Sequence, residues 1–253
     1  MCRAARPRRG LDVGKADGGR KIGKQMLAVI RFRIGRSLRF LSHAETMRLF
    51  QRACVRAGVK VAYSQGYNPH QRMSLVLPRS VGVESDDELL CLWLAEGQAD
   101  PVARPSWPCL SRAGSPCHTG IDNEALKGEL PDGIEIVSVE TSQAKNVPEP
   151  ISARYIMKVQ GQYVDDNARR RIEEILASDK VVVDRRTGEN SRTKPVDVRP
   201  FLESIKAEAG EFTVDCKISQ AGTIRVDEIL GLLHLKTADL TGPVRRTNVK
   251  YAD

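Results

Sequence analysis

The stretch from residue 27 to residue 58 constrains the fold most, because it joins a strand pattern directly to a helix pattern. Residues 27–34 read LAVIRFRI, in which apolar residues alternate with two arginines, as in a strand with one buried face. Ser42 and Glu45 then have the spacing of a helix-capping box, and Gly58 closes the apolar period that follows. The sequence therefore predicts a strand followed by a helix of about four turns.

Further patterns extend this start into an α+β fold. The first part of the chain follows the order β-α-β-β-α-β, which is the ferredoxin-like arrangement of an antiparallel sheet with two helices on one face. A similar order begins again after a proline-containing linker at residues 146–150. We therefore predict two ferredoxin-like (βαββαβ) units with antiparallel sheets, at residues 26–145 and 151–253. The main expected strands are residues 27–34, 59–63, 73–77, 88–94, 134–140, 154–160, 180–185, 211–218 and 222–226, and the expected later helices are residues 123–130, 164–177 and 227–235.

Two segments have no apolar period. Residues 1–25 are basic, and we expect them to form a disordered tail, whereas residues 98–120 contain four prolines and read as a disordered insertion in the first unit. All apolar runs are short and interrupted by charge, so we expect no membrane span. The basic tail lacks the apolar core of a secretory signal, so we expect a cytoplasmic protein.

Charge is distributed unevenly along the chain. Residues 26–80 contain ten lysines and arginines against one acidic residue, a net charge of +9, whereas residues 81–253 carry −7. Arg48, Arg52 and Arg56 repeat at every fourth position of the expected helix, on the face that turns away from the core. Such a one-signed surface favours an anionic partner such as RNA. The alternative is a solvated arginine-rich face without a ligand.

The six cysteines give no sign of a metal site or a disulfide framework. They are scattered, and Cys54 and Cys91 fall within apolar patterns, as expected of small buried side chains in a reducing compartment. Cys109, Cys117 and His118 lie near one another in the sequence but lack a fourth ligand. We therefore expect no metal and no cofactor.

The segment from Tyr63 to Arg72, YSQGYNPHQR, holds more aromatic and polar side chains than a turn requires. Gly66 permits a positive φ, and Pro69 favours an extended residue before it, so the path is defined and can direct side chains. Rings would stack on an unpaired base, a hydroxyl and amides would meet base edges, and the arginine would meet a phosphate. The expected RNA-binding residues of the loop are Tyr63, Ser64, Gln65, Gly66, Tyr67, Asn68, His70 and Arg72.

Other residues complete this predicted site or stand as alternatives to it. Arg39 and His43 lie near the start of the expected helix and would join the loop if the sheet brought helix start and loop together. In a purely structural loop, the amides would bond only to the loop's own backbone. Lys194, Asp197 and Arg199 are secondary binding candidates, although Asp197 and Arg199 can more simply form an ion pair on one face of a strand.

Several strings of the sequence resemble one known family. They include RFLSHAE at residues 39–45, AYSQGYNPHQR at residues 62–72 and VGVES at residues 81–85, followed by KPVDVRP, TIRVDEILGLL and RRTNV. They resemble the radical-SAM-linked protein family, a bacterial domain of unknown function found beside or fused to radical S-adenosylmethionine (SAM) enzymes. The resemblance covers nearly everything from Met26 onward. Val226 departs from the pattern, because the family usually has proline there.

The resemblance implies a radical SAM partner, and the charge and the loop chemistry indicate RNA. A radical SAM cluster needs three closely spaced cysteines, whereas no two cysteines here are closer than eight positions, so the chain is not itself such an enzyme. Our hypothesis is a non-catalytic RNA-binding or substrate-presenting adaptor. One alternative is a metal-independent endoribonuclease with His70 and His43 as acid and base and Arg39 or Arg72 stabilising the phosphorane. The other is a protein-interaction module with a basic face.

Overall fold

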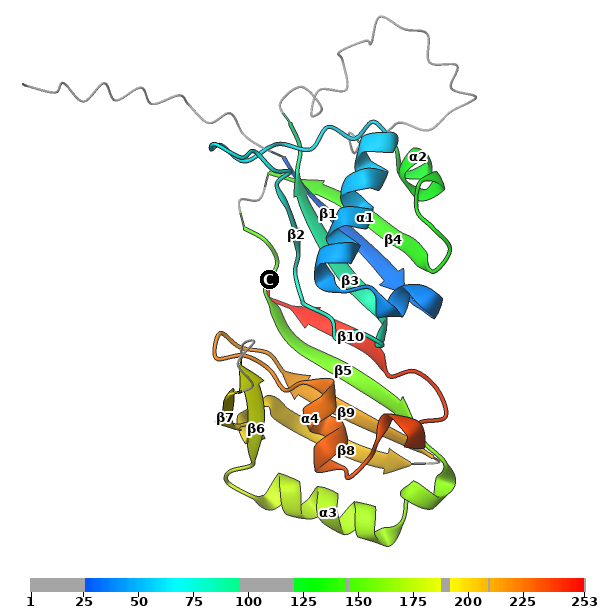
Figure 1. Cartoon of the computed structure of the whole chain (residues 1–253), viewed down its shortest axis with the longest axis vertical. Helices are drawn as coiled ribbons and strands as arrows, with labels where there is room; N and C mark the ends of the chain where they lie inside the picture. Colours follow the sequence, from blue (N-terminus) through cyan, green and yellow to red (C-terminus); the bar gives the residue numbers. More distant parts are fainter. Residues whose placement is uncertain (1–25, 96–120, 144–145, 188–191, 209, 253) are drawn as a thin grey trace, which may run out of the picture.

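The computed structural model describes residues 26–95, 121–143, 146–187, 192–208 and 210–252, and one large sheet runs through it (Figure 1). The predicted tail and insertion lie outside the described residues. The strands are β1 (Leu27–Ile34), β2 (Met73–Leu75), β3 (Glu84–Trp93), β4 (Ile134–Ser142), β5 (Pro150–Lys158), β6 (Val182–Thr187), β7 (Arg192–Asp197), β8 (Leu202–Glu208), β9 (Glu211–Lys217) and β10 (Arg245–Tyr251). The helices are α1 (His43–Arg56), α2 (Asn123–Gly128), α3 (Asp166–Ala177) and α4 (Val226–Leu232), with short 3-10 turns η1 (Arg36–Phe40), η2 (Gly161–Tyr163), η3 (Arg199–Phe201) and η4 (Thr237–Asp239).

Eight strands form one sheet in the order β4-β1-β3-β10-β5-β9-β8, with β2 also paired to β3, and β6 and β7 form a separate hairpin. All neighbours in the large sheet are antiparallel except β3 and β10, which run parallel and share only the register pairs Arg245–Glu84 and Arg246–Ser85. The predicted α+β class is confirmed. The sheets of the two halves are nevertheless joined into one, which the sequence did not predict.

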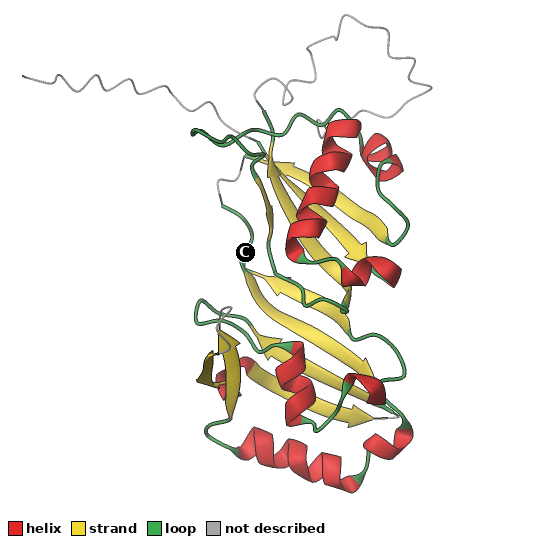
Figure 2. Cartoon of the chain, in the orientation of Figure 1, coloured by secondary structure: helices red, strands yellow, loops and turns green. Residues whose placement is uncertain are grey.

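Residues of all four helices pack in the two cores, and in Figure 2 α1 and α4 cross in front of the strands while α3 lies along the lower edge of the sheet. Helices α1 and α2 cover the apolar core of the first half, and α3 and α4 cover that of the second. Arg246 is in register with Tyr155 in the second core and bonds to Glu88 beneath α1, so both cores lie on one side. Antiparallel sheets commonly pack one face against a core and leave the other face to solvent, and here the helices cover the packed face.

Helix α1 has the predicted beginning and end. The Ser42 hydroxyl accepts from the Glu45 backbone, and the Glu45 carboxylate accepts from the Ser42 backbone, which completes the capping box. Gly58 takes a φ of +70°, which favours glycine, just beyond the last turn. Phe50 packs edge-on against Phe32 of β1 with ring centroids 4.7 Å apart, and this contact fixes α1 over the centre of the first half.

Two predicted strands are wrong in detail. Residues 59–63 make only isolated bridges, through Val61 and Tyr63, because their backbone groups bond to several different segments. Strand β3 begins at Glu84, four residues before the predicted Glu88, because the acidic residues at its start find basic partners instead of ending the strand.

In the second half, residues 222–226 do not form the predicted strand. They lead into α4, for which Arg225 is the N-cap and Val226 the first helical residue. That position also suits proline, because the first backbone N–H groups of a helix have no partner within it. Strand β8, which the sequence patterns did not separate, forms the edge of the sheet beside β9. Within the described residues, no helix has the length and apolar character needed to cross a membrane.

Candidate functional site

The segment from Tyr63 to Arg72 forms an exposed loop held by its own hydrogen bonds. The Ser64 N–H donates to the His70 carbonyl at 2.8 Å, and the His70 N–H donates to the Ser64 hydroxyl at 3.0 Å. Tyr63 and Gln71 close the base of the loop as an isolated bridge. The loop therefore has a defined path, and Gly66 takes a positive φ of +154°, which residues with a side chain rarely adopt, even though a Cβ there would meet no atom within 4 Å.

These bonds divide the predicted loop residues into two groups. Ser64 Oγ also contacts His70 Nδ1 at 3.0 Å, so both side chains are used within the loop. Gln65, Tyr67 and Asn68 are exposed, and no side-chain hydrogen bond joins them to other described residues. Tyr67 is fully exposed, at 106% of its reference area. The loop thus presents an aromatic ring and two amides to solvent.

Arg72 lies at the base of the loop instead of at its tip. Its guanidinium lies 4.8 Å from the ring centroid of Trp93, at the end of β3. This cation–π contact holds the last loop residue against the sheet. We therefore assign Arg72 first to anchoring the loop, and the predicted phosphate contact stays a prediction.

The three arginines of α1 line a groove of about 620 Å³ between this helix and residues 128–131. Arg56 bonds to the carboxylate and the carbonyl of Glu129, so its charge is paired. Hydrogen bonds from Ser42 and, to a smaller extent, the charge of Arg48 lower the pKa of Glu45. Arg52 has no ion pair with the described residues. The groove therefore retains positive charge at Arg52 and part of it at Arg48.

The start of α1 and the loop are not brought together, so the condition for one combined site is not met. His43 begins α1 and the loop follows its end, and fourteen residues of helix span about 20 Å. His43 lines a narrow pocket with Thr46 and Glu88. Arg39 lies before α1, with its guanidinium 4.5 Å from the ring centroid of Phe40. His43 and His70 are thus at opposite ends of the helix and cannot act on one phosphate within this chain.

A buried polar network at the start of α1 was missed by sequence reasoning. Arg246 is 1% exposed and bonds to the Glu88 carboxylate and to the carbonyls of Leu77 and Pro78. Burial alone would lower the pKa of Arg246, but the interactions with Glu88 and Tyr155 together outweigh it and raise the pKa above its ordinary value. We call this contact between β10 and β3 the seam. Its signal in the sequence was the pair of arginines in RRTNV, within an apolar pattern.

Part of the uneven charge along the sequence is cancelled in space. Arginines from residues 26–80 pair with acidic residues from residues 81–142. These ion pairs are Arg31–Asp87, Arg33–Glu135, Arg39–Glu84 and Arg56–Glu129. Arg31 and Arg33 alternate with the core residues of β1, so their pairs lie on the face of the sheet away from the helices. Arg31 and Arg33 are therefore both paired on that face, which does not favour a phosphate contact by either of them.

The secondary candidates have structural contacts. Asp197 accepts from the backbone N–H groups of Val181 and Arg199 at 2.9 and 3.2 Å. The Arg199 guanidinium donates to carbonyls at the end of α3 and to that of Leu202. The predicted Asp197–Arg199 ion pair is not among these contacts, because β7 ends at Asp197 and Arg199 begins η3. Lys194 is exposed on β7.

The cysteines that the structure describes are free and buried: Cys54, Cys91 and Cys216. Burial raises the pKa of Cys54 and of Cys91 to about 11, so both are poor nucleophiles. The described residues hold no cluster of three or more potential metal ligands. Cys109, Cys117 and His118 lie outside the described residues.

Comparison with known proteins identifies one family. Residues 28–104 and 118–228 match the model of a family described as "Uncharacterized protein conserved in bacteria (DUF2344)". No curated protein matches. A chain of a solved structure described as "Crystal Structure of a Cbf5-Nop10-Gar1 Complex" aligns with the present chain. The alignment covers 88% of the present chain and 48% of the matched chain, at 10% sequence identity and a TM-score of 0.39. The chain thus spans about half of that protein, and the likeness is too low to support a functional argument.

Proposed function

The chain belongs to the DUF2344 family of bacterial proteins, and we propose that this member is a non-catalytic RNA-binding adaptor that presents RNA to a radical SAM enzyme. One observation carries the RNA part: Tyr67 is fully exposed at the tip of a loop that its own hydrogen bonds hold in place. The radical SAM partner is proposed from the resemblance of the sequence strings.

An exposed tyrosine on a fixed loop suits binding to an unpaired base. A tyrosine side chain has only two rotatable bonds, and the backbone of this loop is already hydrogen-bonded, so ordering the ring against a base costs little conformational entropy. Such stacking contributes roughly 1–3 kcal/mol per base. The exposed amides of Gln65 and Asn68 stand beside Tyr67 in the sequence and supply both donors and acceptors for a base edge.

The groove along α1 supplies a complementary electrostatic contact. Arg52 lacks an ion pair within the described residues, and Arg48 is exposed in the same groove. Arginine pairs well with phosphate, because its planar guanidinium matches the phosphate oxygens. In this proposal the loop recognises a base, and the α1 groove holds phosphates of the RNA backbone that lie further along the same RNA chain.

We also propose that each half is a ferredoxin-like unit, in keeping with the predicted boundaries of residues 26–145 and 151–253. The pairings give the order β4-β1-β3-β2 in the first half and β10-β5-β9-β8 in the second. Both orders place the last strand of a half beside its first, as the split βαβ arrangement requires. In the second half, the β6–β7 hairpin is inserted between the first helix and β8.

The endoribonuclease remains a second candidate because of one contact. Ser64 Oγ lies 3.0 Å from His70 Nδ1 and fixes the orientation of the imidazole, as catalytic histidines require. The other proposed catalytic groups are poorly placed, since Arg72 stacks on Trp93 and His43 lies at the far end of α1. We therefore expect RNA to stay intact over time with the parent protein and with His70→Ala alike. Cleavage by the parent that His70→Ala abolishes would favour the enzyme.

Tyr67→Ala tests the proposed adaptor. We expect it to weaken the binding of single-stranded RNA about tenfold, because the base no longer has a ring to stack on. Tyr67→Phe should bind nearly as well as the parent, because it keeps the ring. Fluorescence anisotropy with labelled oligonucleotides would measure the affinity, and thermal unfolding would show that Tyr67→Ala folds normally. Normal RNA binding by Tyr67→Ala would remove the loop from the proposal.

A further inference from the structure

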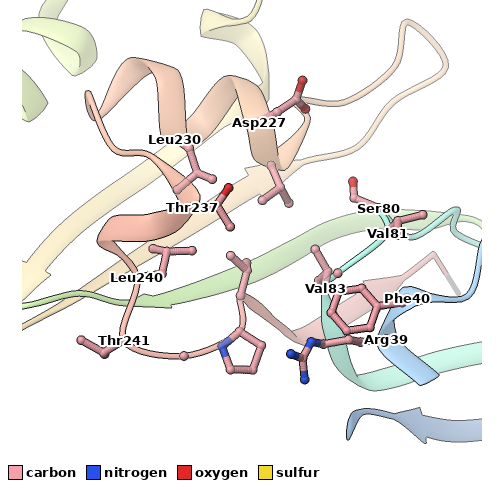
Figure 3. Close-up of a pocket in the computed structure, with 15 residues that line it drawn as sticks. Arg39, Phe40, Ser80, Val81, Val83, Asp227, Leu230, Thr237, Leu240 and Thr241 are labelled. Atoms are coloured by element: carbon pink, nitrogen blue, oxygen red, sulfur yellow. The ribbon is translucent and has the colours of Figure 1, made fainter. Parts of the chain in front are cut away.

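A cavity of about 590 Å³ lies between the two halves and belongs to neither the loop nor the α1 groove (Figure 3). One wall consists of Arg39, Phe40 and residues 80–83 of the first half. The opposite wall consists of the start of α4, Thr237 and residues 240–244 of the second half. We call it the seam cavity. Segments of three of the strings named above, RFLSHAE, VGVES and TIRVDEILGLL, meet at it.

The first wall is fixed without any ligand. The Arg79 guanidinium donates to the carbonyls of Arg39 at 2.7 Å and Leu41 at 3.1 Å, and it also donates to the Val83 carbonyl. The Gly82 N–H donates to the Arg39 carbonyl at 2.8 Å. These bonds tie η1 to the loop before β3. A wall that is already rigid loses little entropy on binding, which favours affinity.

This wall exposes apolar surface inside a concave site. Phe40 is 58% exposed and Val81 is 59% exposed, so both are among the large apolar side chains that the fold leaves uncovered. The Arg39 guanidinium lies 4.5 Å from the ring centroid of Phe40, which leaves the rest of the ring available. Exposed apolar groups that gather in a cavity between two halves are typical of a ligand site.

The polar groups of the cavity define what the ligand must carry. The ion pair of Arg39 with Glu84 is long, at 3.7 Å, so Arg39 is only partly neutralised. Asp227 is exposed at the other wall and has no hydrogen bond or ion pair to the described residues. Figure 3 shows the two charged side chains at separate ends of the lining, with Phe40 beside Arg39. A ligand therefore needs an anion near Arg39 and donors near Asp227.

We propose that the seam cavity binds one nucleotide unit. Its base would stack on Phe40, its phosphate would meet Arg39, and its ribose hydroxyls would donate to Asp227. Carboxylates bind ribose hydroxyls in the same way in dinucleotide-binding sites. An aliphatic ligand would instead cover the Asp227 carboxylate without giving it a partner, which is unfavourable. The unit is either a free mononucleotide or one residue of an RNA chain.

Calorimetric titration of the full-length protein distinguishes these sources. Each of AMP, GMP, CMP and UMP would be titrated to millimolar concentration, followed by short oligonucleotides of each base. Binding of a mononucleotide identifies a free ligand. Binding of the oligonucleotide alone identifies a unit within RNA if Tyr67→Ala retains this binding and Phe40→Ala weakens it. The proposal predicts at least one of these two results, and the absence of both would overturn it.

Variants then place the ligand in the cavity. Phe40→Ala should weaken the binding about tenfold, as expected when a stacking platform for a base is removed. Asp227→Asn should reduce the preference for ribonucleotides over 2′-deoxyribonucleotides severalfold. Val137→Ala is a matched control, because Val137 is an exposed apolar residue on β4, outside the cavity lining. Phe40 is largely exposed, so its removal should spare the core, and thermal unfolding checks this.

Nucleotide binding in the seam cavity can be tested separately from RNA binding by the loop. With a mononucleotide as ligand, Tyr67→Ala should bind as the parent does, because Tyr67 is not part of the cavity lining. If Phe40→Ala and Asp227→Asn both bind nucleotides normally, the seam cavity is not the site and the proposal is wrong, whatever the outcome at Tyr67.

Discussion

The two ends of helix α1 use polar side chains in opposite ways. Near its start, Arg246 and Glu88 are almost completely buried, and Arg246 bonds to a carboxylate and two carbonyls. After its end, Tyr67 and its neighbours are exposed, with the bonds of the loop confined largely to Ser64 and His70. One set of groups forms hydrogen bonds within the fold, and the other set is exposed to solvent.

This difference explains why net charge alone is a poor guide to the binding surface. A buried arginine costs a large desolvation energy and is tolerated only when it is paired and hydrogen-bonded. Such an arginine adds to the formal charge and offers nothing to RNA. Arg31 and Arg33 on the sheet also add to the formal charge while each is paired with a carboxylate. Arg52, by contrast, has no ion pair with the described residues.

The largest expected effect is at the seam. Arg246→Leu should destabilise the protein by about 3–5 kcal/mol, because it leaves Glu88 buried without its partner. The double variant Arg246→Leu, Glu88→Leu should regain much of this stability, because it leaves no buried charge unpaired. Urea unfolding would measure both. A single variant as stable as the parent would mean that the seam pair does not hold the halves together.

A smaller effect is expected in the α1 groove. Replacing Arg48 and Arg52 by glutamine should reduce the slope of log affinity against log salt by about 0.7 for each phosphate of single-stranded RNA that the protein no longer neutralises. Stability should change little, because arginine and glutamine have similar helix propensities. Arg33→Gln is the control, since Arg33 is already paired with Glu135. Equal slopes in all three proteins would exclude the groove from the RNA site.

The smallest expected effect concerns the ion pair between Arg154 and Asp215 on the sheet, which is neither fully buried nor fully exposed. A hydrogen bond from Arg154 lowers the pKa of Asp215. A carboxylate with a lowered pKa in the folded state stabilises the protein above its unfolded pKa, near 4, and loses this contribution as the pH falls through the folded value. Because Arg154 is 41% exposed, the contribution should be about 1 kcal/mol at most.

Urea unfolding at pH 7 and pH 3 would measure this contribution. The parent should lose more stability than Asp215→Asn between these values, because the variant has no carboxylate to protonate at this position. Identical losses would show that the Arg154–Asp215 pair contributes nothing. Glu135→Gln, at a pair whose two members are both largely exposed, is the matched control and should follow the parent.

Local features of the fold could be predicted from the sequence, because each depends on neighbouring residues. Ser42 and Glu45 cap α1, Gly58 ends it, and the alternation at residues 27–34 gives β1 its buried face. The separation of His43 from the loop could also have been foreseen, since the predicted helix is long enough to keep them apart.

Long-range features could not be predicted. Nothing local shows that Arg246 will meet Glu88, which is 158 residues earlier, or that β10 will pair with β3 in parallel. The sequence pattern treated the acidic start of β3 as a boundary because its partners come from elsewhere in the chain. The seam cavity was missed for the same reason, since its two walls are distant in the sequence.

Photo-crosslinking with mass spectrometry tests the central claim most directly. The full-length protein would be irradiated with single-stranded RNA that contains a photoreactive base, digested, and searched for peptides that carry a nucleotide. The account predicts crosslinks in the peptide that contains Tyr63 to Arg72, and their disappearance in Tyr67→Ala. Crosslinks confined to the face of the sheet away from the helices, or a complete absence of crosslinks, would contradict it.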